Sequence, residues 1–404
     1  MNIPRSLDSF YSWKRLAITL LIATVANVGM WAIVVIMPAV QSEFGIDRAD
    51  ASLPYTLTMV GFAFGSVFIG RAVDRYGITA SLIGAASCIA AGYVLAALSS
   101  SIYLLSASQL LIGFGTSAGF GPLIADISHW FLRRRGIAVA ITASGNYLSG
   151  AIWPVLLSPV LSNSGWQAVY LILAAITVFA IVPLSLLLRR KLPFEAAESA
   201  DSLATANARS VQFSPRVLQL LLVVAGLGCC VAMSMPQVHL VSLCVDLGYG
   251  PVAGAEMLSL MLLGGVVSRL VFGLIADRLG GVLTLLIGST LQCIALFFYL
   301  PFDGLASLYL VSLVFGLSQG GIVPSYALIV REYLPAREAG ARVGTVLMAT
   351  IMGMALGGWL SGWIYDLTGS YQIAFINGIL WNVLNIAIIG MIFFKSRSRA
   401  RFAV

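Results

Sequence analysis

The chain has 404 residues, of which 59% are hydrophobic and only 10% are charged. A soluble domain carries roughly a quarter charged residues and needs a polar surface, so this composition excludes an ordinary soluble protein. The net charge of +7 comes from short clusters of Lys and Arg between apolar runs, a distribution typical of membrane topology signals and not of a nucleic-acid-binding surface.

Apolar segments of about 20 residues, the length that crosses a bilayer core of ~30 Å as a helix, follow one another along the chain. They lack the alternation over about ten residues that is typical of membrane-barrel strands, and only helices or closed barrels satisfy their backbone in lipid. The sequence therefore predicts an all-α membrane protein with about twelve transmembrane helices. The predicted spans lie near 16–40, 52–73, 79–100, 102–130, 136–161, 166–188, 217–245, 252–276, 281–300, 305–331, 341–365 and 372–394.

Two features indicate that the chain consists of two similar halves. One long polar connection, at about 190–215, separates six spans from six. Segments 70–77 and 273–280 share the pattern G-x-x-x-D-R-x-G, with Asp-Arg pairs 203 positions apart, and such self-similarity indicates a duplication. We predict an N-terminal six-helix bundle over 1–189, a cytoplasmic linker over 190–215 and a C-terminal six-helix bundle over 216–404, related by pseudo-two-fold symmetry.

The two G-x-x-x-D-R-x-G loops resemble the signature of the major facilitator superfamily, which implies a secondary transporter that works by alternating access. An arginine of the first loop can pair with an acid on another helix of the same half, and Asp126 is the predicted partner of Arg75 or Arg71. Such a pair would hold one access state closed. The predicted conformational latch comprises Asp74, Arg75, Asp126, Asp277 and Arg278.

The distribution of Lys and Arg predicts the orientation. With the N-terminus inside, 21 of the 23 Lys and Arg residues are cytoplasmic, which leaves Arg48 outside and Arg269 within a span. By the positive-inside rule, this asymmetry predicts a multi-pass protein of the bacterial inner (plasma) membrane with both termini in the cytoplasm. The polar segment before the first span lacks a small-residue cleavage site, so we expect no removable signal peptide.

Arg269 is the most informative residue, because it lies well inside an apolar span. An arginine at the centre of a span costs about 2.5–3.5 kcal/mol on insertion scales, so it requires a polar cavity or a partner. Positions 265 and 273, one turn away on either side, are both glycine. A guanidinium matches a carboxylate with two parallel hydrogen bonds, so we predict that Arg269 binds a small organic anion; an internal ion pair is the alternative.

Other groups at a similar depth are candidates for the walls of the same pocket, although each of them is individually more often helix-packing material. The predicted substrate-binding set is Arg269, Asn27, Trp31, Phe120, Asn146, Tyr147, Tyr326 and Met348.

His239 and Asp246 form the predicted proton-coupling pair. They are seven residues apart and share one helix face, and a histidine titrates in the physiological range. We expect the pair to face an outer vestibule, where it would carry a proton; the alternative is a solvated histidine near a helix end.

Several segments resemble the monocarboxylate transporter family within the superfamily, including its bacterial members. The strongest match is Trp130 to Ala138 (WFLRRRGIA), continued by Ala143-Ser144-Gly145. The resemblance implies transport of lactate- or pyruvate-like monocarboxylates, usually with a proton, and it implies that Arg269 holds the substrate carboxylate. Animal members carry an acid one turn before this arginine, where the present chain has Gly265.

The predicted partners are a small organic anion, a proton and the lipid bilayer, with no nucleic acid and a functional monomer. No metal, cofactor or enzyme activity is expected, because the five cysteines and two histidines lack ligand spacing. Three alternatives stay open: an organic-anion exchanger or carrier of larger aromatic carboxylates, an exporter of hydrophobic compounds, and a membrane sensor that transports nothing.

Overall fold

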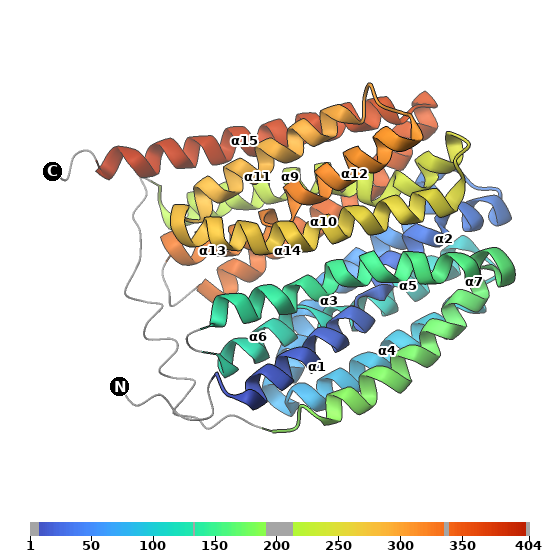
Figure 1. The fold of residues 1–404 in the computed structure, drawn as a ribbon, viewed down its shortest axis with the longest axis horizontal. Helices are drawn as coiled ribbons and strands as arrows, with labels where there is room; N and C mark the ends of the chain where they lie inside the picture. Colours follow the sequence, from blue (N-terminus) through green and yellow to red (C-terminus); the bar gives the residue numbers. More distant parts are fainter. Residues whose placement is uncertain (1–7, 132–133, 191–212, 335–338, 401–404) are drawn as a thin grey trace.

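The computed structural model describes residues 8–131, 134–190, 213–334 and 339–400, so most of the predicted linker lies outside the described residues. Every long element in them is helical (Figure 1). The first group is α1 (Phe10–Ala26), α2 (Val28–Phe44), α3 (Arg48–Tyr76), α4 (Ile78–Ala97), α5 (Ile102–Thr116), the short 3₁₀ helix η1 (Ser117–Gly119), α6 (Gly121–Trp130) and α7 (Arg135–Leu186). The second group is α9 (Pro215–Asp246), α10 (Gly250–Leu279), α11 (Gly281–Phe298), α12 (Leu305–Gln319), α13 (Ile322–Tyr333), α14 (Ala339–Thr368) and α15 (Tyr371–Ala400).

The helices account for the twelve predicted spans. Within the described residues, 11 helical segments are long and apolar enough to cross a membrane. One of them, Ile137–Leu186, has 50 residues, which is far longer than the ~20 residues a bilayer requires. It bends at Gly165, where φ is 79°, and therefore supplies the two spans predicted near 136–161 and 166–188.

Local sequence signals start and end these helices. Ser9, Ser101 and Ser214 cap α1, α5 and α9, and each hydroxyl accepts a hydrogen bond from a backbone N–H in the first turn, as is usual for serine at this position. Gly77 and Gly280 make the turns from α3 to α4 and from α10 to α11, each with φ of 83°, a backbone conformation that side chains disfavour.

The packing of glycines repeats between the two halves. A Cβ added to Gly113 would overlap the carbonyl of Thr58, and one added to Gly316 would overlap the carbonyl of Met261. Both partners of the second pair lie 203 positions after those of the first, the same offset as the two Asp-Arg pairs. Backbones this close require glycine, so the duplication predicted from sequence extends to how α3 packs on α5 and α10 packs on α12.

Three predicted spans are interrupted, where the sequence analysis expected continuous helices. α1 gives way to α2 at Asn27, whose side chain donates to the carbonyls of Ala23 (2.7 Å) and Gly119 (3.0 Å), so that it competes with the helix. α5 is separated from α6 by η1 and Phe120, and α12 from α13 by Gly320 and Gly321. The break between α12 and α13 leaves backbone carbonyls without a helical N–H partner, so a side chain can donate a hydrogen bond to them.

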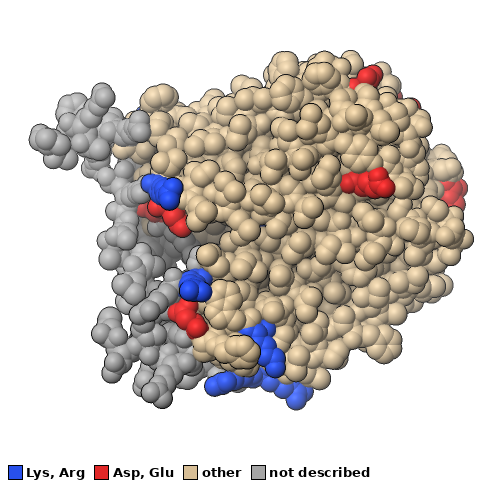
Figure 2. Space-filling view, in the orientation of Figure 1, with Lys and Arg blue, Asp and Glu red and all other residues tan. Residues whose placement is uncertain are grey.

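We call the end of the molecule at which α1 begins and α15 ends the terminal end; it is on the left in Figure 1. On the face shown in Figure 2, Lys and Arg gather at this end. α3 begins at the opposite end, where α9 ends.

Candidate functional site

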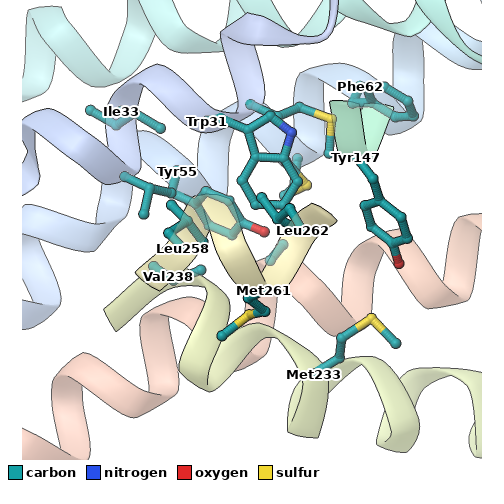
Figure 3. Close-up of a cluster of buried hydrophobic side chains, with 14 of the residues drawn as sticks. Trp31, Ile33, Tyr55, Phe62, Tyr147, Met233, Val238, Leu258, Met261 and Leu262 are labelled. Carbon is teal, nitrogen blue, oxygen red and sulfur yellow. The ribbon is translucent and has the colours of Figure 1, made fainter. Parts of the chain in front are cut away.

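The two halves meet along a seam lined by large apolar side chains (Figure 3). From the first half come Trp31, Ile33, Tyr55, Phe62 and Tyr147, and from the second come Met233, Val238, Leu258, Met261 and Leu262. Glycines bring the helices together here: Gly150 lies against Trp31 and Leu262, and Gly265 against the ring of Tyr147. A charged group in this seam is therefore enclosed by both halves.

Arg269 lies in the seam. Only 5% of the residue is exposed. Its Nε donates to the Gly320 carbonyl (3.2 Å) and its Nη1 to the Ala143 carbonyl in the first half (2.5 Å). The guanidinium carbon lies 4.1 Å from the ring centroid of Tyr147, a favourable cation–π geometry. The ion pairs among the described residues involve Arg15 and Arg48, so the partners of Arg269 are neutral.

One predicted pocket residue contacts this guanidinium, and two others connect to it in turn. Tyr147 contacts it directly, and the preceding residue, Asn146, accepts from the indole Nε1 of Trp31 through its side-chain oxygen (3.0 Å). Asn27 lies one helical turn before Trp31 and is fully buried, with a side-chain oxygen that lacks a hydrogen-bond partner within the described structure. Trp31, Asn146, Tyr147 and Arg269 thus form one continuous group across the seam.

Three other predicted pocket residues have different surroundings. The ring of Phe120 packs on Phe62, 6.4 Å between centroids. Tyr326 is fully buried inside the second half, where its hydroxyl donates to the Asn385 side chain (2.7 Å). Met348 is 45% exposed on α14. None of these contacts joins them to the Arg269 group.

A polar cluster that the sequence analysis did not anticipate joins the halves at the opposite end, and we call it the clasp: Arg48, Asp246, Asp366 and Tyr371. Arg48 Nη2 donates to both carboxylate oxygens of Asp246 (3.0 and 3.2 Å), and Nη1 donates to the Tyr371 hydroxyl (3.1 Å). The Asp366 carboxylate accepts from the backbone N–H groups of Arg48 (2.8 Å) and Ala49 (2.7 Å) at the start of α3. An acid at a helix N-terminus is stabilised by the helix dipole.

His239 belongs to the same network and does not face an open vestibule. It is fully buried; its Nε2 lies 2.7 Å from the Gly358 carbonyl and its Nδ1 lies 3.1 Å from the Tyr371 hydroxyl. In the neutral ring that these partners favour, Nε2–H donates to Gly358 and Nδ1 accepts from Tyr371. The prediction of a solvent-facing pair is therefore wrong: Asp246 pairs with Arg48, and His239 reaches Asp246 only through Tyr371 and Arg48.

The predicted pairing of Asp126 with Arg75 or Arg71 is also wrong. Arg15 Nε and Nη2 donate to the two oxygens of Asp126 at 2.8 and 2.7 Å. Arg15 also donates to the carbonyls of Leu188 (3.0 Å) and Arg190 (3.2 Å). The pair ties α1 to α6 and to the end of α7 at the terminal end, all within the first half. Several arginines lie at this end, and sequence position alone does not distinguish which of them reaches Asp126.

Removing the Asp126 carboxylate is expected to destabilise the protein. Arg15 is 2% exposed, and Asp126→Ala leaves its charge buried without a counter-ion, which typically costs about 3–5 kcal/mol. The free energy of unfolding in detergent measures the effect. Asp50→Asn, at an exposed acid in the first turn of α3, is the control and should change stability by well under ~1 kcal/mol. Equal effects of the two variants would contradict this assignment.

The other predicted latch residues lie at the terminal end. Asp277 and Arg278 are exposed near the end of α10, while Asp74 lies in α3 with a side chain outside the described part of the structure. The start of α11 is capped by a different acid: the carboxylate of Glu332 accepts from the N–H of Gly281 at 3.1 and 3.2 Å.

The sequence matches the Major Facilitator Superfamily over residues 19–303 and 246–403. The chain belongs to this superfamily. It is a multi-pass membrane transporter and not an enzyme, as is general for this superfamily.

Named relatives within the superfamily are distant. Monocarboxylate transporter 13 of Bos taurus is 26% identical over 321 residues, 78% of this chain and 73% of the relative. Monocarboxylate transporter 11 of Homo sapiens is 31% identical over 306 residues, 70% of this chain and 62% of the relative. An uncharacterized MFS-type transporter of Bacillus subtilis, YcxA, is 25% identical over 90% of this chain and 91% of the relative.

A solved structure shares the fold. The crystal structure of a bacterial homolog of the human lysosomal transporter Spinster, in an inward-facing and occupied conformation, superposes with a TM-score of 0.71 at 13% identity, covering 96% of this chain and 97% of that one. At this identity the likeness concerns the fold alone, and it agrees with the predicted all-α membrane architecture.

Proposed function

We propose that the protein is a proton-coupled transporter of small monocarboxylate anions of the lactate and pyruvate type, which works by alternating access. The observation that carries the proposal is the buried guanidinium of Arg269, whose hydrogen-bond partners in the described structure are neutral carbonyls. Hydrogen bonds to a carboxylate are roughly twice as strong as those to a neutral acceptor. A substrate anion therefore competes well for this group once the seam opens.

The surroundings of Arg269 support a small anion with an apolar body. Tyr147 offers an aromatic face beside the charge. The neighbouring residue, Asn146, accepts a hydrogen bond from the indole of Trp31, which adds a second aromatic ring to the same group. Relatives named monocarboxylate transporters match most of the chain. Of the buried arginines in the described residues, Arg15 and Arg48 are paired with aspartates. Arg269 alone is then available to balance one carboxylate, which favours a monoanion over a dianion.

The charge distribution supports an orientation with the terminal end in the cytoplasm of a bacterial inner membrane. The clasp supports an inward-facing state, because its hydrogen bonds join the halves at the opposite, outer end. Deeper in the seam, the bond from Arg269 to the Ala143 carbonyl also joins the halves. The solved structure with the same fold is also described as inward-facing. Opening of the clasp would then be the first step of the change to the outward-facing state.

The proposal is tested by flux in proteoliposomes. Labelled lactate and pyruvate are expected to accumulate under an inward proton gradient, and unlabelled monocarboxylates should compete while dicarboxylates should not. Liposomes without protein give the background. If no monocarboxylate accumulates or exchanges above that background, the proposal is wrong.

We propose His239 as the proton-binding group, coupled to the clasp through Tyr371. Protonation of Nδ1 removes the acceptor for the Tyr371 hydroxyl and places a second cation close to Arg48. A protonated His239 therefore opposes the closed clasp, whereas a neutral one supports it. The protonation state of His239 would in this way control whether the clasp at the outer end is open or closed.

His239→Gln is expected to abolish accumulation driven by a proton gradient, because a glutamine does not titrate, while exchange of substrate at equal pH persists. Uptake with and without the gradient, together with exchange at symmetric pH, measures both properties. The control is His129→Gln, at the only other histidine of the chain, which is exposed at the terminal end. Gradient-driven accumulation in His239→Gln at the wild-type level would exclude His239 as the proton carrier.

A carrier of larger, aromatic carboxylates is the second candidate. The seam between the halves is lined by Trp31, Met233, Met261 and Leu262 (Figure 3), and flexible methionine side chains adapt to bulky apolar groups. Inhibition of uptake by benzoate-like acids but not by lactate would favour this candidate.

A further inference from the structure

A groove of about 360 Å³ opens on the side of the first half, between α3 and α4, with Phe114 of α5 in its lining. Small residues make room for it: Ala72 on α3, and Ala80 and Gly84 on α4. Phe68 and Tyr76, which also line it, are 54% and 64% exposed. In a transporter embedded in a bilayer, such exposed apolar side chains face lipid.

The second half lacks the small residues that form this groove. The turns that join the helix pairs are alike, with φ of 83° at both Gly77 and Gly280, so positions 203 residues apart correspond. Large side chains stand at four corresponding positions: Ile275 for Ala72, Leu283 for Ala80, Ile287 for Gly84 and Leu291 for Cys88. The groove is therefore a feature of the side chains of the first half and not of the repeated backbone.

Two arginines of α3 directly precede residues that line the groove: Arg71 precedes Ala72, and Arg75 precedes Tyr76. Arg71 and Arg75 are both exposed at the terminal end of α3, and the guanidinium carbon of Arg75 lies 5.3 Å from the ring centroid of Tyr76. The ion pairs of the described side chains involve neither of them. In the second half only Arg278 remains, because Leu274 stands in place of Arg71. The first half therefore has both the groove and an additional arginine, whereas the second half has neither.

We propose that this groove binds one acyl chain of an anionic phospholipid, whose phosphate contacts Arg71 and Arg75. From Phe68 to Tyr76 the groove follows α3 for about 12 Å, starting at the basic end, where a headgroup lies. Apolar contact alone does not select one lipid, since all acyl chains are alike in this respect. The arginines supply the selection, because basic residues at the membrane surface attract anionic headgroups.

Native mass spectrometry of the purified protein with equimolar phosphatidylglycerol and phosphatidylcholine of identical chains tests the proposal. The wild type is expected to retain phosphatidylglycerol about tenfold better. Gly84→Ile, which introduces the residue of the second half, should abolish this preference; a Cβ at Gly84 meets no atom within 4 Å, so the fold accepts the change. Arg71→Leu should reduce the preference without closing the groove.

Gly390→Ile on α15 is the matched control, because a Cβ there also meets no atom within 4 Å, and it should retain lipid as the wild type does. Ala80→Leu fills the groove from a second position and should repeat the effect of Gly84→Ile. Equal retention of both lipids by the wild type would overturn the proposal, as would unchanged preference in both groove-filling variants. Displacement of phosphatidylglycerol by an equimolar uncharged acyl alcohol would overturn the role of the arginines.

Discussion

Arg269→Gln is expected to reduce carboxylate flux by about 30-fold or more, since truncating one partner of a buried charge pair costs about 2–5 kcal/mol. Glutamine removes the positive charge and the paired donors that match a carboxylate, yet it can still donate one hydrogen bond. Arg269→Lys keeps the charge but not the planar pair of donors, so its flux should lie between that of the wild type and that of Arg269→Gln. Initial rates of labelled uptake in proteoliposomes measure the effect.

The unfolding temperature distinguishes a loss of substrate binding from misfolding. Replacing a buried cation that has neutral partners should leave the unfolding temperature of Arg269→Gln unchanged or higher, because burying the charge itself is costly. Arg342→Gln is the matched control: this arginine, also in the second half, donates to the Gln219 side chain and to the Pro215 carbonyl at the terminal end. Wild-type flux in Arg269→Gln, or equal loss in both variants, would exclude Arg269 as the substrate-binding group.

Breaking the clasp is expected to shift the protein toward an outward-open arrangement. Asp366→Asn weakens the contact with the two N–H groups at the start of α3, and Arg48→Gln removes the pair with Asp246. Hydrogen bonds to charged groups contribute about 1.5–3 kcal/mol each, so either change should raise the outward-open population at least about tenfold.

A cysteine placed beneath the clasp reports this shift. Thr56, two turns after Arg48 on α3, donates to the Ala355 carbonyl across the seam at 3.2 Å. In a variant without the five native cysteines, Thr56→Cys should react with an impermeant maleimide from the outer side about tenfold faster when the clasp is broken. Asp303→Asn, at an exposed acid between α11 and α12, should leave the rate unchanged. Unchanged labelling in both clasp variants would contradict a gating role.

The fold was predictable from sequence because lipid imposes its requirements on every span separately. About 20 apolar residues specify a helix irrespective of its neighbours, and the repeated Asp-Arg loops indicate the duplication. The breaks at Asn27 and Gly320 were not predictable, because they depend on partners elsewhere in the fold: Asn27 donates to Gly119, and Gly320 accepts from Arg269.

The site was predictable only in part. The cost of a charge inside a span singles out Arg269 as a candidate binding residue. Tyr147 and Trp31 are predicted to lie near it only because they occur at a similar depth in their own spans. The pairs Arg15–Asp126 and Arg48–Asp246 were missed, since sequence shows which end of the molecule a charge lies at but not which partner it meets there. One signal was available for the clasp: Arg48 is the single basic residue that the predicted topology leaves on the outer side.

The carbonyl partners of Arg269 bear on how the carrier cycles. One belongs to Ala143 in the first half and the other to Gly320 in the second, so the backbone itself solvates the cation while the halves are together. If the protein works as the transporter proposed above, reorientation without cargo would leave this cation hydrogen-bonded to carbonyls, and obligatory one-for-one exchange of anions would not be required. For the proposed carrier, the expected consequence is net movement of anion into liposomes that contain no anion inside.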